Sequence, residues 1–161
     1  MKYALLLTLF FALPGQAASM DGRVVGITDG DSVTVLDFDR VQHNIRLAGI
    51  DAPEIGQNFG NRSKESLSEL VYDQIVLVET EKKDRYGRDI GKLLVQGVDA
   101  GLAQVQRGLA WHYKAYASEQ SANDRKLYDF AESEARASRL GLWVAPDPVP
   151  PWKFRRKKRA K

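Results

Sequence analysis

The stretch VQHNIRLAGIDAPE, residues 41–54, decides the fold expected for this chain. Apolar residues alternate with polar ones around Arg46, which is typical of a half-buried β-strand. Two carboxylates, Asp51 and Glu54, then stand on either side of a proline. We therefore expect a strand that ends at the rim of a sheet in a short acidic loop.

A second acidic segment lies upstream, in GRVVGITDGDSVTVLDF, residues 22–38. It predicts two strands joined by a turn at Asp29-Gly30, and Asp31 opens the second strand. Antiparallel pairing places the start of that strand near the end of the next one. Asp31, Arg46 and the acidic loop after residue 50 are thus expected to share one rim.

Two more strands are predicted over residues 74–80 (QIVLVET) and 84–98 (DRYGRDIGKLLVQGV). Helical spacing is found in residues 61–73, in residues 99–110 with Asp99 as the expected N-cap, and in residues 118–143. This order favours a mainly β protein with α (α+β), built as a five-stranded OB-fold Greek-key barrel with three packed helices. A closed barrel would bring Arg88, in the turn before the fifth strand, to the same mouth.

Both ends of the chain differ from this body. Residues 1–17 resemble a cleavable signal peptide, with Lys2, a short apolar run and small residues before a cut after Ala17 or Ala18. An uncleaved anchor and a buried helix are the alternatives. We expect a secreted or periplasmic mature chain with no stable membrane insertion. Residues 18–145 form the predicted domain, and residues 146–161 a Pro-rich linker and a basic disordered tail.

Charge is distributed unevenly along the chain. Of the 24 Lys and Arg residues, seven lie in the last ten positions and one lies in the leader. The body therefore has sixteen basic and 21 acidic residues, a net charge of −5. An acidic body is unsuited to general clamping of nucleic acid, so phosphate binding needs a local constellation, whereas the tail is suited to contacting polyanions. The absence of cysteine excludes disulfides and cysteine–metal sites. His43 and His112 have no metal-pair spacing and are expected to be surface or core residues.

The charged residues at the predicted mouth suggest a specific chemistry. Carboxylates without histidine or cysteine suit a hard cation such as Ca²⁺ or Mg²⁺, and two arginines beside it suit a phosphate. Taken singly, each has an ordinary alternative. Asp31 could serve turn geometry, Asp51 and Glu54 could belong to a solvated loop, and Arg46 and Arg88 could form surface ion pairs.

The segments DGDSVTV, IRLAGIDAPE, DRYGR and GLAWHYKAY, in this order, resemble the staphylococcal (thermonuclease-like) nuclease family from about Gly22 to Trp143. The resemblance implies an OB-type barrel with three helices. It also implies one Ca²⁺ ion, held by Asp31, Asp51 and the main-chain carbonyl of Ala52. The family often has threonine at this last position, and a carbonyl ligand survives the change.

The resemblance also assigns the catalytic and substrate-binding groups. Glu54 corresponds to the general base or water-orienting residue, and Arg46 and Arg88 to the arginines that hold the scissile phosphate. The remaining positions are expected to contact neighbouring parts of the substrate: Arg85, Tyr86, Tyr116 and Tyr113. Of these, Tyr116 aligns best with a base-stacking tyrosine, and Tyr113 is either its partner or a core residue.

The sequence therefore predicts a secreted, monomeric, calcium-dependent nuclease that hydrolyses phosphodiester bonds of DNA and/or RNA, endonucleolytically. The alternatives are a non-catalytic OB-fold module that only binds nucleic acid or protein, and a protein that acts at membrane surfaces through its basic tail. The loop after Glu54, IGQNFG, is shorter than the lysine-rich loop of well-known family members.

Overall fold

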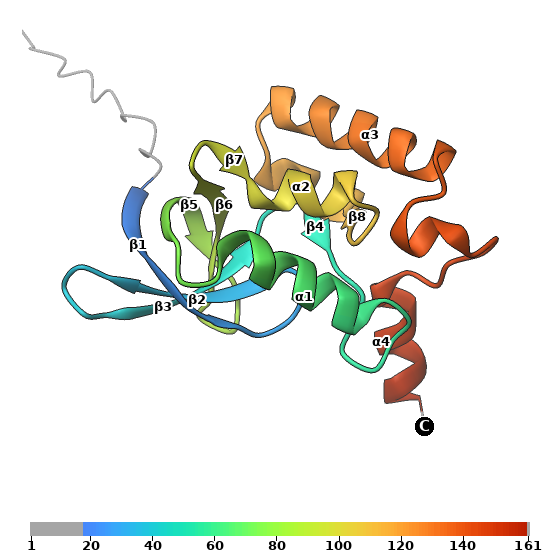
Figure 1. The fold of residues 1–161 in the computed structure, drawn as a ribbon. Helices are drawn as coiled ribbons and strands as arrows, with labels where there is room; N and C mark the ends of the chain where they lie inside the picture. Colours follow the sequence, from blue (N-terminus) through green and yellow to red (C-terminus); the bar gives the residue numbers. More distant parts are fainter. Residues whose placement is uncertain (1–17, 161) are drawn as a thin grey trace, which may run out of the picture.

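A closed five-stranded barrel forms the body of the computed structural model, which describes residues 18–160 (Figure 1). The barrel strands are β1 (Ala18–Ile27), β2 (Ser32–Asp37), β3 (Gln42–Leu47), β5 (Ile75–Lys83) and β6 (Asp89–Val95). They run in the order β3-β2-β1-β5-β6, and parallel pairing of β3 with β6 closes the ring. The predicted five-stranded α+β barrel is confirmed.

Three short strands complete the sheets. Strand β7 (Val98–Asp99) pairs with β6, and β4 (Ile50–Asp51) pairs with β8 (Trp111–His112). The second pairing fastens the acidic loop after β3 to the segment that follows the second helix. It therefore gives the loop a fixed position relative to the barrel.

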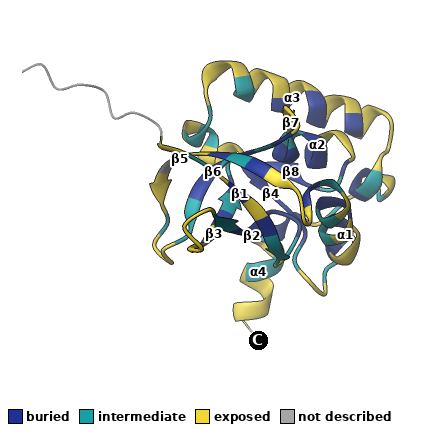
Figure 2. Cartoon of the chain, turned by 60° about the vertical axis from the view of Figure 1, so that its left-hand side comes forward, coloured by how far each residue is buried: buried dark blue, intermediate teal, exposed yellow. Residues whose placement is uncertain are grey.

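The three predicted helices are present as α1 (Gly60–Val71), α2 (Ala100–Gln106) and α3 (Ala122–Ala137). The carboxylate of Asp99 accepts a hydrogen bond from the backbone N–H of Leu102, so the predicted N-cap is confirmed. Short 3₁₀ turns cover Lys114–Glu119 and Gly141–Val144. Helix α3 lies over α2, with its buried face inward and its outer face exposed (Figures 1 and 2).

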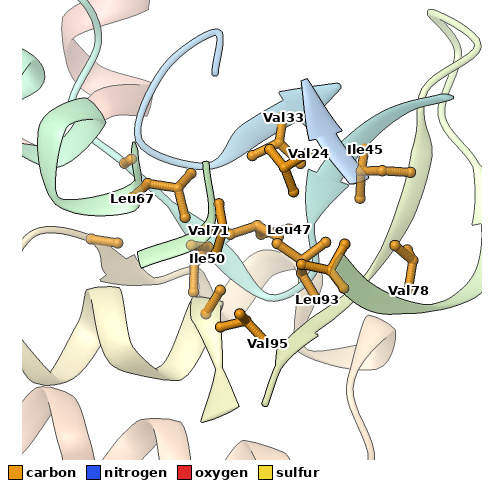
Figure 3. Close-up of a cluster of buried hydrophobic side chains, with 14 of the residues drawn as sticks. Val24, Val33, Ile45, Leu47, Ile50, Leu67, Val71, Val78, Leu93 and Val95 are labelled. Atoms are coloured by element: carbon orange, nitrogen blue, oxygen red, sulfur yellow. The ribbon is translucent and has the colours of Figure 1, made fainter. Parts of the chain in front are cut away.

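The core lies between the barrel and α1 (Figure 3). Ile45 and Leu47 of β3 point into it, as the alternation in the sequence predicted, and Leu67 and Val71 of α1 meet them from the other side. All four side chains are buried. Burying each contributes about 1.5–3 kcal/mol, and this packing makes the rim above it a rigid platform.

The C-terminal segment differs from the prediction. Residues 151–159 were expected to be disordered, and this is wrong, because they form helix α4 (Pro151–Arg159). Proline at the first helical position is favourable there. Trp152 stacks on Tyr113 at 4.9 Å between ring centroids and meets Trp111 edge-on at 5.6 Å. Aromatic contacts that no local pattern reveals thus hold this helix against the body.

The predicted leader, residues 1–17, lies outside the described residues. In residues 18–160, the structure contains no helix that is both long and apolar enough to span a bilayer.

Candidate active site

Asp31 is the first buried carboxylate of the site. It stands at the start of β2, with only 4% of its surface exposed. Its oxygens accept hydrogen bonds from the Ser32 hydroxyl at 2.9 Å and from the Ala52 N–H at 2.8 Å, and Arg46 Nη1 lies 2.7 Å from Oδ1. Pairing of Ser32 with Arg46 across β2 and β3 creates this juxtaposition, as the sequence predicted.

A buried glutamine of α2 holds the turn before Asp31 in place. Gln104 Nε2 donates to the Gly30 carbonyl at 2.9 Å and to the Ser63 carbonyl at 2.8 Å, and Gln104 Oε1 accepts from the Ser66 hydroxyl at 2.8 Å. A Cβ at Gly30 would stand 1.8 Å from Ser63 Oγ, so only glycine fits there. Sequence reasoning missed Gln104, since nothing distinguishes it from a surface glutamine of a short helix.

Asp51 is the second buried carboxylate, in β4, with 1% of its surface exposed. Arg46 Nη2 lies 3.5 Å from its Oδ1, so one guanidinium bridges Asp31 and Asp51. Arg46 also donates to the Ile50 carbonyl at 3.1 Å. The predicted convergence of the two aspartates at one rim is therefore observed.

A cation that the sequence prediction did not include also reaches Asp51. Arg155 of α4 donates from Nη2 to Asp51 Oδ2 at 2.8 Å and from Nη1 to Asp51 Oδ1 at 3.0 Å. The same Nη1 donates to Glu54 Oε1 at 2.6 Å. The sequence signal was only a basic tail, which does not indicate which of its residues faces inward.

Glu54 lies just outside the buried pair. Its side chain is 35% exposed, so solvent reaches it. Its backbone N–H donates to the Gln57 side chain at 3.1 Å, and a Cβ at Gly60 would stand 2.0 Å from its carbonyl oxygen. The close approach of α1 at Gly60 thus fixes the position of this loop.

Arg88 reaches the same cleft from the turn before β6. Asp84 holds its guanidinium, with Nε and Nη2 at 2.8 and 2.7 Å from Oδ2. The parallel pairing of Arg46 with Ile90 carries this turn to the mouth of the barrel. Closure of the barrel therefore brings Arg88 beside Arg46, as predicted.

The cleft that these residues line has a volume of about 260 Å³. All but one of the sequence-predicted site residues line it: Asp31, Arg46, Asp51, Ala52, Glu54, Arg85, Tyr86, Arg88 and Tyr116. The exception is Tyr113, whose ring packs between Tyr116 and Trp152. Arg159 and Asp29 line the cleft as well; the sequence had placed Asp29 only in the turn before β2 and had given Arg159 no individual role.

The clustered charges change the acidity of the aspartates. Burial opposes ionisation of Asp31, but the charge of Arg46 and the bond from Ala52 outweigh burial and lower its pKa. Burial raises the pKa of Asp51, and the bonds from Arg155 offset only part of this effect. Burial, followed by the negative charge of Asp31, raises the pKa of Asp29 from 3.8 to about 6.

The pKa of Asp29 predicts a pH-dependent contribution to stability. Between about pH 4 and 6, Asp29 stays protonated in the folded wild type but is ionised in the unfolded chain. The protonated carboxyl therefore contributes stability at low pH, and this stability is lost as the pH rises through about 6. Asp29→Asn cannot ionise, so it is expected to gain stability relative to wild type between about pH 4 and 6. Urea unfolding in chelator at several pH values measures this, and a constant difference would contradict it.

The donor set suits a hard divalent cation. Within residues 18–160, no three carboxylate or histidine side chains form a ready metal-binding group. Asp31 and Asp51 nevertheless face one cation position, because a single guanidinium pairs with both. Carboxylate and carbonyl oxygens are ligands that Ca²⁺ prefers.

The two histidines lie apart from the cleft. His43 is half-buried and lies 2.8 Å from Asp37. His112 is buried, and its ring lies 2.9 Å from the Gln120 side chain. Neither histidine lines the cleft.

Comparison with known proteins identifies the family of this chain. Residues 44–145 match the family described as "Staphylococcal nuclease homologue". A "Micrococcal nuclease" of Shigella flexneri is 40% identical over 148 residues, covering 86% of this chain and 82% of the relative. An "Uncharacterized endonuclease" of Escherichia coli is 37% identical over 158 residues, covering 98% and 99%, and one of Haemophilus influenzae is 39% identical over 137 residues, covering 85% and 74%. This chain therefore belongs to the staphylococcal nuclease homologue family and is a nuclease.

Proposed function

We propose that the protein is a calcium-dependent endonuclease that hydrolyses phosphodiester bonds of DNA and/or RNA as an exported monomer. One observation carries the proposal: two buried carboxylates, a solvent-accessible glutamate and the arginines Arg46 and Arg88 line a single cleft. A module that only binds nucleic acid has no need of this combination. The predicted leader in residues 1–17 supports export.

Asp31, Asp51 and the Ala52 carbonyl are the residues that would hold Ca²⁺. When bound, the ion supplies Lewis-acid chemistry toward a non-bridging phosphate oxygen. Both aspartates are buried and poorly solvated, so their negative charges favour a nearby cation, and in this structure Arg46 and Arg155 supply that charge.

Glu54 is proposed to take or orient the proton of the attacking water, since its carboxylate borders the buried pair and remains open to solvent. Arg46 and Arg88 are proposed to donate hydrogen bonds to the phosphate oxygens, on which charge grows in the transition state. Arg46 is held by Asp31 and Arg88 by Asp84, so both donors are oriented before substrate arrives.

The outer cleft is proposed to bind the rest of the substrate. Tyr86 is exposed, and Arg85 lies over its ring at 4.9 Å, a pair suited to a neighbouring phosphate and to stacking. Tyr116 is exposed and is the preferred base-stacking residue. Tyr113 is not assigned this role while α4 is docked, because Trp152 then stacks on its ring. Lys157 and Lys158 are exposed and are proposed to attract the polyanion.

Cleavage is expected to require Ca²⁺. The chain without its leader, residues 18–161, is incubated with heat-denatured DNA and with RNA in millimolar Ca²⁺, in Mg²⁺ and in chelator. We expect fragments in Ca²⁺ and none in chelator, and the two substrates establish the preference. Glu54→Gln, purified in parallel, excludes a contaminating nuclease if it is inactive. Tight binding without cleavage in any metal would instead identify a binding module.

A further inference from the structure

Helix α4 places the guanidinium of Arg155 beside Asp51, one of the proposed metal ligands. Both terminal nitrogens of Arg155 donate to Asp51, one to each carboxylate oxygen, at 3.0 and 2.8 Å, and Nη1 also donates to Glu54 at 2.6 Å. Bidentate contacts of this kind are the strongest that arginine makes with a carboxylate. Arg155 thus occupies both oxygens of Asp51.

The helix that carries Arg155 has few other contacts. Trp152 packs on Tyr113 and Trp111, and in the preceding segment the Val149 carbonyl accepts a bond from Gln57 at 2.5 Å. Figure 2 shows α4 projecting from the body with most of its surface exposed. A Pro-rich connection, residues 146–151, joins it to the domain.

Helix α4 is also a weak helix by itself. It has nine residues, six of them basic and none acidic, and no side chain caps its N-terminus. Isolated helices of this length are marginal in water, and neighbouring like charges destabilise them further. Docking through Trp152 and the ion pairs of Arg155 is therefore what maintains the helix.

We propose that Arg155 is a built-in substitute for the divalent cation, so that docking of α4 and binding of Ca²⁺ at Asp51 exclude each other. This inference rests on the proposed function of the site. Ca²⁺ lies about 2.3–2.6 Å from its oxygen ligands. A guanidinium on the same two oxygens would face it directly, and repulsion between the two cations at that range is large.

Arg46, the other arginine that reaches Asp51, cannot act as a displaceable substitute for the metal ion. Arg46 extends from β3, which pairs with both β2 and β6, has 14% of its side chain exposed and donates to the Ile50 carbonyl. Arg155 lies on a terminal helix behind a proline-rich connection, so its withdrawal breaks no strand pairing. The competition therefore couples the metal site to release of the C-terminal helix, and the coupling acts equally in both directions.

Calorimetric titration of Ca²⁺ into the chain without its leader tests this in the absence of substrate. We expect Arg155→Gln to bind Ca²⁺ about tenfold more tightly than wild type, within the usual range of such couplings. Arg156→Gln is the matched control, because it removes the same charge from the exposed side of the same helix. We expect Arg156→Gln to change the Ca²⁺ affinity by less than about twofold, because salt and solvent screen an exposed charge.

Hydrogen exchange of residues 150–160 provides the second readout. Saturating Ca²⁺ is expected to remove protection from α4 in the wild type. The proposal is overturned if α4 stays protected in Ca²⁺, which would make Arg155 a ligand that remains at the site. It is also overturned if Arg155→Gln and Arg156→Gln bind Ca²⁺ alike, or if wild type and both variants bind none.

These outcomes are separable from failure of the proposed function. Calcium-dependent cleavage with equal affinities for Ca²⁺ in wild type and Arg155→Gln leaves the nuclease proposal intact and removes only the competition. If Arg155→Gln binds Ca²⁺ more tightly than wild type but neither protein cleaves DNA or RNA, the competition stands and the nuclease proposal fails.

Discussion

Arg88→Ala is expected to lower the turnover number about 100-fold or more while leaving the fold intact. Removing one preoriented donor to the transition state typically has this effect. The side chain of Arg88 is 32% exposed and that of Asp84 13%, so their ion pair is partly buried. Because Arg88 itself is open to solvent, we expect its loss to cost about 1 kcal/mol of stability. Turnover on denatured DNA at saturating Ca²⁺, together with thermal unfolding, measures both effects.

Arg23→Ala is the matched control for that variant. Arg23 also pairs with an aspartate at the surface, Asp73 at 3.0 Å, but it does not line the cleft. It should retain wild-type turnover. An Arg88→Ala protein that keeps more than about a tenth of wild-type turnover would show that Arg88 does not stabilise the transition state.

Arg46→Ala is expected to lose at least as much activity and, in addition, about 3–5 kcal/mol of stability. The guanidinium of Arg46 lies 2.7 Å from buried Asp31 and reaches Asp51 as well. Truncation leaves buried carboxylates with less compensating charge, which is among the costliest single changes in a protein. Urea unfolding in chelator measures the loss.

Arg46→Lys separates the two effects of Arg46. It keeps a positive charge near Asp31 and should recover part of the stability, but it lacks the planar fork that matches phosphate and should remain poorly active. An Arg46→Ala protein with wild-type activity would refute the assignment. One with wild-type stability would show that Asp31 and Asp51 are better solvated than their burial indicates.

The contrast between these arginines shows where sequence reasoning stops. From the motifs alone, both are phosphate-binding residues, and their removal is expected to have the same effect. Their different burial follows from their positions: Arg46 lies within β3, which is paired on both sides, whereas Arg88 lies in a turn. Burial depends on what packs above a residue, and no motif reports that.

Much of the architecture follows from local patterns. Alternation and turn residues predicted the strands that form the barrel, and hairpin pairing of β2 with β3 places Asp31 beside Arg46 without help from the rest of the chain. The placement of Asp31 beside Arg46 is thus a consequence of nearest-neighbour strand pairing, whereas Asp51 also depends on the pairing of β4 with β8. The Asp99 cap of α2 is equally local.

Contacts between distant segments could be decided only by the tertiary structure. Gln104 holds the turn at Gly30 from 74 positions away, and Arg155 reaches Asp51 across 104. The helix that bears Arg155 has no strong helical signal, because a short, highly basic segment gains its order from a surface assembled elsewhere. Residue types and short-range pairing determined the chemistry of the cleft. Long-range packing decided which cation occupies it, because burial and charge compensation arise only when remote parts of the chain meet.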